Sequence, residues 1–225
     1  MKSHFFMYSM LSLSYLGACS SGSETQSNRS VKKSSTDDGT LDCESQWALA
    51  VKQQPVGAVF TYTAKGTKSD LGGLASPFTH KETVTVSSDS GISRKVEISG
   101  LSSFGVKDTS TSVTLTREKF LQTCKSANGQ PATLSALGGT ISFDGTMVDE
   151  TISLSGEQIN AQRAKGQASD IKYGGYSGSA DVVIYVSNEY PALVLKQDIT
   201  IKGSSISLAN GAVLKEELSS KLPVK

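Results

Sequence analysis

The sequence predicts a mainly β domain with small helical inserts. Apolar residues alternate with Thr and Ser over many short stretches, which is typical of antiparallel strands with one buried and one exposed face. Turn residues, such as Asp-Gly and Asn-Gly pairs, separate these stretches. Two short segments instead place apolar residues at helical spacing. Because no change of composition divides residues 41–225, we expect them to form a single domain.

Residues 1–18 have the features of a signal peptide. Lys2 supplies a positive charge, and residues 5–18 form an uncharged apolar segment too short to span a bilayer. The tetrapeptide Leu16-Gly17-Ala18-Cys19 resembles the lipobox of bacterial lipoproteins. This resemblance implies cleavage before Cys19, acylation of Cys19 with lipid such as palmitate, and permanent attachment to a membrane. The alternative is a plain secretory signal that happens to end beside a cysteine.

The residues after Cys19 bear on location. Lipoproteins that stay in the inner membrane of bacteria with two membranes commonly carry Asp next, whereas Ser20 and Ser21 follow here. The resemblance therefore implies a cell-envelope protein of the outer membrane that faces the periplasm. Residues 19–40 contain Cys19 and a Ser-rich stretch whose single aliphatic residue is Val31, too little apolar surface to fold. We expect this stretch to be a disordered tether.

The charge balance argues against a nucleic-acid partner. The chain has 22 basic and 21 acidic residues, and the predicted leader removes Lys2 but no acidic residue. The mature chain is then electrically balanced, without the excess of Lys and Arg that nucleic-acid binding requires.

Chemistry-bearing residues are scarce in the predicted domain. His4 belongs to the leader, so His80 is the remaining histidine, and it lies in what we interpret as a solvent-facing loop. The sequence contains no nucleophile elbow, phosphate-binding loop or zinc-protease motif. We therefore expect no catalytic residues, no metal site and no cofactor.

Two short helices are predicted. Asp42 can cap the first, which runs to about Lys52, because its carboxylate can accept from the free amides of the first turn. Thr116 can cap the second, from about Arg117 to Ser126. Each helix has one apolar face, made in the first by Cys43, Trp47, Ala50 and Val51 and in the second by Phe120, Leu121 and Cys124.

Cys43 and Cys124 are expected to form a disulfide. The envelope is an oxidising compartment, and Cys19 is committed to lipid, so these two thiols are free to pair. The alternative is two buried free thiols. A link between them implies that the two helices pack on the same part of a sheet.

The strand pattern covers most of the remaining domain. The predicted strands, with their apolar markers, are Ala58–Tyr62, Val84/Val86, Ile92/Val96/Ile98, Val113/Leu115, Ile141/Phe143, Met147, Ile152/Leu154, Ile159/Ala161, Val182–Val186, Leu193–Ile201 and Ile206/Leu208. We expect Asp144-Gly145 to form a two-residue hairpin turn. After Asn210-Gly211, an amphipathic tail is expected around Val213, Leu214 and Leu218.

Part of this pattern resembles secreted periplasmic β-meander families and, more distantly, the Lol lipoprotein carriers. The resemblance rests on residues 151–159, residues 182–191 and the pair Leu195-Lys196. It implies a curved antiparallel sheet, or incomplete barrel, with the two short helices packed on its concave side. It also implies a concavity able to hold an acyl chain, lined by Phe60, Tyr62, Val84, Val86, Leu193, Leu195, Ile199 and Ile201. The alternative is that these residues form a solid core.

Taken with the anchor, these features predict a non-catalytic, membrane-anchored envelope lipoprotein that binds or carries an apolar ligand or lipid. The alternative is a structural lipoprotein that meets a protein of the envelope, for which the loop Tyr173–Gly178 is one candidate contact.

Overall fold

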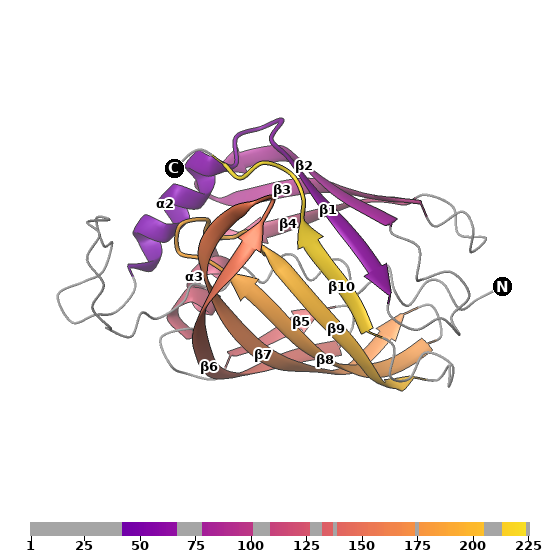
Figure 1. Cartoon of the computed structure of the whole chain (residues 1–225). Coiled ribbons are helices and arrows are strands. Elements are labelled where there is room, and N and C mark those ends of the chain that lie inside the picture. The colour runs from indigo at the N-terminus through magenta and orange to yellow at the C-terminus, as the bar shows by residue number, and fades with distance from the viewer. Residues whose placement is uncertain are drawn as a thin grey trace.

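The computed structural model describes residues 42–66, 78–100, 109–126, 132–136, 139–173, 176–204 and 213–223. Within these ranges two helices and ten strands form one curved antiparallel sheet with short helices packed on it (Figure 1). The elements are α2 (Cys43–Gln53), β1 (Val59–Gly66), β2 (Phe78–Ser88), β3 (Gly91–Ser99), β4 (Thr109–Thr116), α3 (Arg117–Ser126), β5 (Ala132–Ala136), β6 (Gly139–Leu154), β7 (Glu157–Tyr173), β8 (Tyr176–Val186), β9 (Lys196–Ser204) and β10 (Val213–Leu218).

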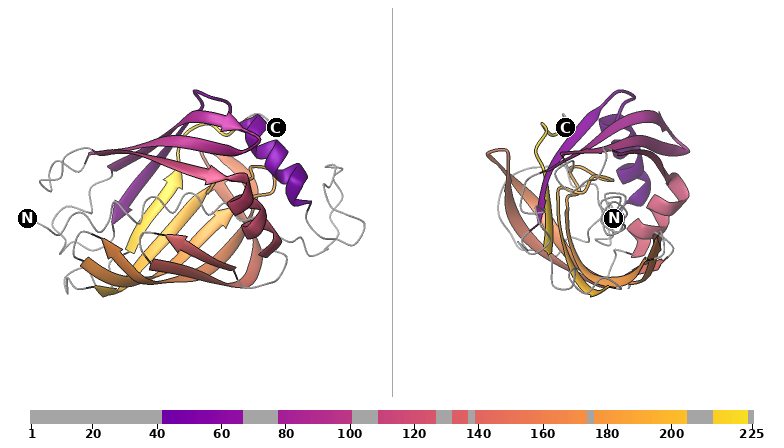
Figure 2. Two further views of the ribbon diagram at one scale, coloured as in Figure 1. Left: turned by 180° about the vertical axis from the view of Figure 1, so that it is seen from behind. Right: turned by 90° about the vertical axis from the view of Figure 1, so that its right-hand side faces the viewer.

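The sheet is an open barrel rather than a closed one. Its strand order is β4-β3-β2-β1-β10-β9-β8-β7-β6-β5, so β4 and β5 are the two edges. Seen end-on, the sheet curls around a central axis, and α2 and α3 lie where its two edges approach each other (Figure 2). The predicted fold class, a mainly β incomplete barrel with two short helices, is confirmed.

The last strand joins the two halves of the sheet. β10 pairs with β1 from Tyr62↔Leu218 to Gly66↔Leu214, and it pairs with β9 on its other side. The segment for which the sequence predicts an amphipathic tail is therefore a strand of the sheet, a pairing that the sequence analysis did not predict. Lys215 and Glu217 point outward and are exposed, whereas Glu216 and Leu218 point inward and are buried, which is the alternation of a strand.

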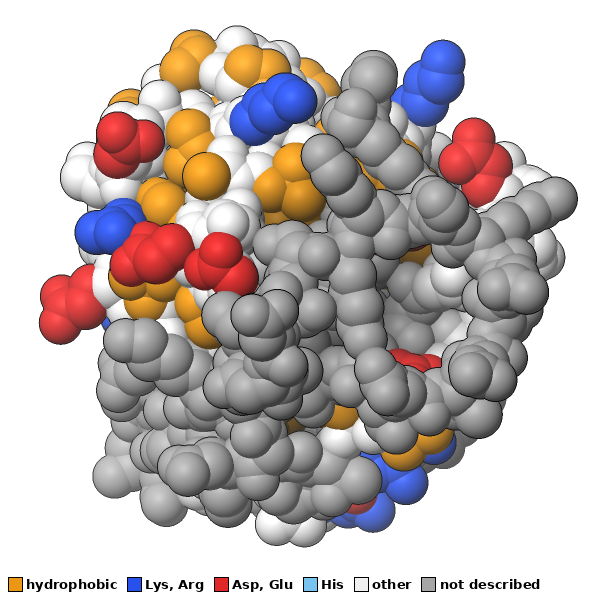
Figure 3. Space-filling model, turned by 90° about the vertical axis from the view of Figure 1, so that its left-hand side faces the viewer, with side chains coloured by type: hydrophobic (Ala, Val, Ile, Leu, Met, Phe, Trp, Pro, Cys, Tyr) orange, Lys and Arg blue, Asp and Glu red, His pale blue; other side chains and the backbone are white. Residues whose placement is uncertain are grey.

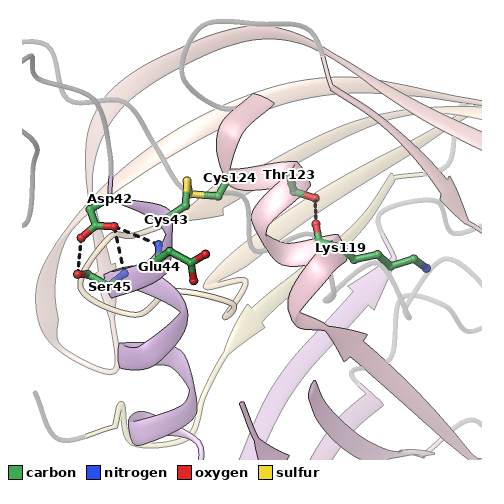
Figure 4. Close-up of a disulfide and its surroundings, with 7 residues drawn as sticks. All are labelled: Asp42, Cys43, Glu44, Ser45, Lys119, Thr123 and Cys124. Carbon is green, nitrogen blue, oxygen red and sulfur yellow. Dashed lines mark hydrogen bonds between the residues drawn. A yellow bond between two sulfur atoms is a disulfide. The ribbon is translucent and has the colours of Figure 1, made fainter. Parts of the chain in front are cut away.

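The first helix begins as the sequence predicts. The Asp42 carboxylate accepts hydrogen bonds from the backbone amides of Glu44 and Ser45, at 3.2 and 3.3 Å. The Ser45 hydroxyl also donates to this carboxylate, and this hydrogen bond, supported by the two amide contacts, lowers the pKa of Asp42. The predicted disulfide is also present: it joins Cys43 at the first turn of α2 to Cys124 in α3, with Cα atoms 5.8 Å apart (Figure 4).

Both helices pack into the concave side of the sheet. Trp47 of α2 and Phe120 of α3 lie with ring centroids 5.2 Å apart, and both are buried. The Trp47 indole donates to the backbone oxygen of Asp89, at 3.0 Å, in the turn between β2 and β3. One continuous apolar cluster includes these rings and inward residues of the sheet such as Phe60 and Ile92. The helices thus close one end of the barrel.

The predicted hairpin at Asp144-Gly145 is absent, because β6 runs without interruption from Gly139 to Leu154. Its ladder with β7 instead shifts register between Phe143 and Met147. The chain reverses later, at Ser155-Gly156, where φ is 50° and 86°. A tight two-residue hairpin turn requires a positive φ at both central residues, and glycine adopts the positive φ at the second position without strain.

Candidate functional site

The exposed side chains of the described residues do not by themselves mark a site. On the face that carries α2, charged and apolar side chains are interspersed (Figure 3). Among the described residues, the large apolar side chains that are most exposed are Val56, Val59, Val86 and Val148. Scattered exposed apolar residues are ordinary for a folded protein. The unusual chemistry lies inside the sheet.

Four ionisable side chains are buried together in the barrel interior. His80, Glu82 and Arg94 have no exposed surface, and Glu216 is 2 % exposed. We call these four residues the charge cluster. Charged side chains are rarely buried unless they are paired, so this cluster is the candidate functional site.

The register of four strands assembles the cluster. On β2, Phe78, His80, Glu82 and Val84 alternate inward, so both ionisable residues face the interior. His80 lies opposite Tyr62 of β1 in the ladder, and Glu216 of β10 lies opposite Ala64 of β1. Arg94 comes from β3, next in the sheet beyond β2. A shift of one residue in β2, β3 or β10 would turn the charged residues of that strand outward.

His80 bridges the two carboxylates. Its Nδ1 contacts Glu216 in a short hydrogen bond, and its Nε2 lies 3.2 Å from Glu82 Oε1. The Tyr62 ring stacks on the imidazole with centroids 5.0 Å apart. Burial opposes a charge on this imidazole, but the carboxylates of Glu216 and Glu82 outweigh burial and raise the pKa of His80 from 6.5 to about 10. His80 is therefore a cation at neutral pH.

Arg94 also forms hydrogen bonds with segments that are not part of the sheet. Its Nη1 donates to Glu82 Oε2 at 2.9 Å, and its Nη2 donates to the backbone oxygen of Ala192 at 2.7 Å and to the Gln54 side chain. Gln54 in turn donates to the Pro191 oxygen at 3.2 Å. The end of α2 and the connection from β8 to β9 are thus held to the interior of the barrel.

The cluster is electrically balanced when His80 is protonated, with two cations and two carboxylates. This balance lowers the penalty for burying the charges, because each is paired with an opposite one. The contacts of His80 described above are with Glu82, Glu216 and Tyr62. The described part of the chain holds no group of His, Cys, Asp and Glu side chains arranged to bind a metal ion.

The cluster divides the interior into two halves. Inward residues of β1, β2, β3, β9 and β10 form four runs across the cluster. Each run begins with an apolar residue of the helix-packed core, passes a cluster residue or its partner, and ends with an apolar residue outside that core. Along the strands these runs are Val84, Glu82, His80, Phe78 on β2; Ile92, Arg94, Val96 on β3; Leu218, Glu216 beside Ala64 on β10 and β1; and Leu195, Gln197, Ile199 leading into and along β9. We call the half without the helices the remote half.

Of the eight residues predicted to line the interior, six are buried, one is exposed and one has a side chain outside the described residues. Phe60, Tyr62, Val84, Leu193, Leu195 and Ile199 are all buried, as expected of residues that face the interior. All except Ile199 belong to the core that packs against the helices. The side chain of Ile201 lies outside the described residues, as do residues 174–175 of the predicted Tyr173–Gly178 loop.

Val86 does not line the interior and is 50 % exposed, which corrects the prediction. The ladder between β2 and β3 shifts register between Val84 and Val86. An extra residue at such a bulge reverses which residues face inward. Ser87 then points toward α2, and its hydroxyl donates to the Val51 backbone oxygen at 3.3 Å.

The sequence analysis missed the cluster because it interpreted residues 77–81 as a loop. His80 instead lies on β2, fully buried. A signal was present: Phe78, His80, Glu82 and Val84 keep the period of two that the prediction recognised from Val84 onward. The period was obscured because polar residues occupy two inward positions, where a half-buried strand usually carries apolar ones.

No helix in the described ranges has the length and apolar character needed to cross a membrane. No protein-family model matches the sequence, and no curated protein sequence matches it.

Proposed function

We propose that this protein is a lipid-anchored, non-catalytic cell-envelope protein that binds an apolar ligand in the remote half of its barrel. The observation that carries this proposal is the small size of the inward side chains there. Ala64, Ala164, Ala168 and Ala180 occupy inward positions on β1, β7 and β8, each buried.

The number of strands determines how much interior volume the inward side chains must fill. An eight-stranded barrel is just wide enough for its side chains to fill, and the interior widens as strands are added. Here ten strands curve around the interior. Larger side chains such as Phe78 and Phe143 fill part of the remote half, and Phe143 packs directly over Gly166. On this proposal, the ligand would lie against these alanines, where the inward side chains are smallest.

Ligand binding is tested by measuring lipid uptake before and after a larger side chain is introduced into the remote half. The mature protein, purified from its native envelope, is expected to carry lipid detectable by native mass spectrometry and, after delipidation, to take up a fluorescent fatty acid. Ala168→Phe should weaken this uptake about tenfold, which corresponds to about 1.4 kcal/mol. The matched control is Gln167→Phe, because Gln167 is the exposed neighbour on the same strand. A wild-type protein that carries no lipid and takes up no probe contradicts the proposal.

The anchor rests on the lipobox resemblance at Cys19 and is tested separately. Cells fed labelled palmitate should incorporate label into the wild-type protein, and membranes should retain that protein. Cys19→Ser should abolish labelling, because serine offers no thiol for the diacylglycerol. A wild-type protein without label, or a Cys19→Ser variant that stays membrane-bound after processing, contradicts the anchor.

A second candidate function is a structural or protein-binding role without a ligand. The dense packing of the helix half favours it, because Trp47, Phe60, Tyr62 and Phe120 fill that part of the interior with aromatic rings. Crosslinking in intact cells separates the two functions. A protein-binding role requires a stoichiometric protein neighbour, whereas ligand binding does not.

A further inference from the structure

Three exposed valines gather where α2 leads into the sheet. A single exposed apolar side chain is ordinary, but three of the four most exposed large apolar residues in the described ranges belong to adjacent segments. They are Val56, in the connection between α2 and β1, Val59, at the start of β1, and Val86, near the end of β2. Their exposed fractions are 64 %, 43 % and 50 %. We call these three residues the valine patch.

Backbone pairing places the three residues side by side. Val59 lies opposite Thr83 in the ladder between β1 and β2, and the Gly57 amide donates to the Val84 oxygen at 2.8 Å. Because the two segments run antiparallel, the chain just before Gly57 lies beside the part of β2 that carries Val86. The valine patch is therefore continuous along one end of this strand pair.

Val56 occupies the tip of a tight turn. The Ala58 amide donates to the Pro55 oxygen at 2.9 Å, and Gly57 has a φ of 89°, which glycine adopts without strain at the third position of such a turn. The loop between α2 and β1 stands out from the body of the sheet (Figure 1). Turn tips usually carry polar residues or glycine. Here the tip instead holds a branched apolar side chain in solvent.

The valine patch is set among uncharged residues. Residues 53–61 and 83–88 contain no Lys, Arg, Asp or Glu. Of the charged residues next to these ranges, Glu82 points into the barrel, and Lys52 and Asp89 are exposed and opposite in sign. Burying an unpaired charge is costly. This part of the surface can therefore leave water without that penalty, and no excess of one charge selects its partner.

We propose that the valine patch docks on the lipid bilayer that holds the N-terminal anchor, with Val56 entering the boundary between headgroups and acyl chains. This inference rests on the anchor of the proposed function and adds the surface by which the folded part meets the membrane. Apolar side chains of surface-bound proteins occupy that boundary. A protruding apolar turn suits such a deformable surface.

The position of the tether favours the bilayer as the occupant. The described chain begins at Asp42, and α2 covers 11 residues, about 16 Å, before the turn that carries Val56. The tether predicted over residues 19–40 has an r.m.s. reach of about 25 Å. An anchored molecule therefore keeps the valine patch within range of the bilayer, and docking costs little additional ordering.

The first test supplies the anchor chemically. In the protein produced from residue 19 onward, Cys43 and Cys124 are joined, so the Cys19 thiol can be coupled to a maleimide lipid in phosphatidylcholine vesicles. Val56→Trp should shift its emission to shorter wavelength and be quenched by lipids with brominated acyl chains. The control Val148→Trp should show neither change. Absence of quenching in Val56→Trp, or equal quenching in both variants, overturns the proposal.

The control position matches the test position. Val148 is 43 % exposed and lies on β6, which β10, β9, β8 and β7 separate from β1. Both variants keep the buried Trp47 as the same background. Because the anchor is coupled chemically, this test judges the valine patch alone. A lack of palmitate labelling in cells refutes the native anchor, and a lack of quenching here refutes the docking surface.

The second test measures binding without an anchor. The same protein carrying Cys19→Ser is mixed with phosphatidylcholine vesicles. Replacing all three valines by threonine exchanges three methyl groups for hydroxyls and should weaken partition about tenfold, whereas Val148→Thr should leave it unchanged. Unchanged partition in the triple variant overturns the proposal. A dimer in solution that the triple variant disperses also overturns it, because a second copy would then cover the patch.

Folding of the variants is checked by urea unfolding. Threonine keeps the branched shape and the strand preference of valine, so the triple variant should retain the wild-type transition. If it does not fold, the pair of tryptophan variants still decides the proposal.

Discussion

At the scale of single residues, the decisive feature is which polar side chains point inward. His80, Glu82 and Arg94 all occupy inward positions of regular strands: apolar inward residues flank the His80/Glu82 pair on β2 and flank Arg94 on β3. Their burial is tolerated because each charge meets an opposite charge or a backbone oxygen. The cluster therefore favours one strand register over its alternatives. If a strand slid by one residue, its charged side chain would move to the outer face of the sheet and its buried partner would be left unpaired.

Removing one member of the cluster should be severely destabilising. Arg94→Met leaves Glu82 buried with one fewer partner, and breaking a buried ion pair in this way costs about 3–5 kcal/mol of unfolding free energy. The control is Lys95→Met on the same strand, because Lys95 is 47 % exposed and its pair with Glu97 lies at the surface. Such surface pairs contribute about 0–1 kcal/mol. Urea unfolding of both variants checks the difference; equal losses would contradict the buried pairing.

The raised pKa of His80 predicts how stability depends on pH. The folded-state pKa, about 10, exceeds the unfolded value near 6.5, so this group stabilises the fold fully below pH 6.5. The groups that face it are Glu82, Glu216 and the Tyr62 ring, with Arg94 beyond Glu82. Its contribution, on the order of a few kcal/mol, should be lost as pH rises from about 6.5 to about 10.

Two measurements check this pH dependence. Urea unfolding across that pH range should show falling stability in the wild type and a flatter profile in His80→Gln. In a protein produced from residue 19 onward, His80 is the single histidine, so its imidazole signals in NMR spectra are unambiguous. They should remain those of a protonated ring at pH 8. A midpoint near 6.5 would refute the ion pairing.

At the scale of elements, local signals predicted the two helices correctly and the hairpin at Asp144-Gly145 wrongly. Asp42 caps α2 and Thr116 caps α3, where its hydroxyl accepts from the Lys119 amide at 3.3 Å. A cap acts within one turn, so a short stretch of sequence is enough to recognise it. Asp144-Gly145 is also a strong local turn signal, yet the long ladder between β6 and β7 runs through it.

The disulfide should stabilise the fold by constraining the unfolded chain. Cys43 and Cys124 are 81 residues apart in sequence, and closing a loop of that length is worth on the order of 4 kcal/mol in the chain-entropy model. The double variant Cys43→Ala/Cys124→Ala should lose up to this amount in urea unfolding. A reducing agent should lower the melting temperature of the wild type but not that of the double variant. Unchanged stability in both cases would contradict the role of the link.

At the scale of the whole molecule, the sheet depends on pairing between distant parts of the chain. β10 is inserted between β1 and β9, and it brings Glu216 to His80 across 136 residues of sequence. The connection between β8 and β9 reaches back to α2, where Gln53 donates to the Glu189 oxygen at 2.8 Å. Contacts of this kind close large loops, so they form cooperatively with the fold rather than before it.

Deleting the last strand should therefore disrupt the whole sheet. A chain that stops after Ser204 lacks both ladders of β10 and leaves His80 without the Glu216 carboxylate. We expect loss of the cooperative unfolding transition, followed by circular dichroism. A synthetic peptide of residues 213–223 should restore part of it by adding the missing strand in trans. A truncated chain that unfolds like the full chain would show that β10 is dispensable.

The sequence by itself determined the fold class, the caps of α2 and α3 and the pairing of Cys43 with Cys124. These features follow from short-range periodicity, from hydrogen bonds within one turn and from a simple count of thiols. Only the tertiary structure decided that His80 is buried, that Val86 points outward and that residues 213–218 form the strand between β1 and β9. Those outcomes depend on register and on partners far away in the chain, because the same polar side chain is stable outside in water or inside beside an opposite charge.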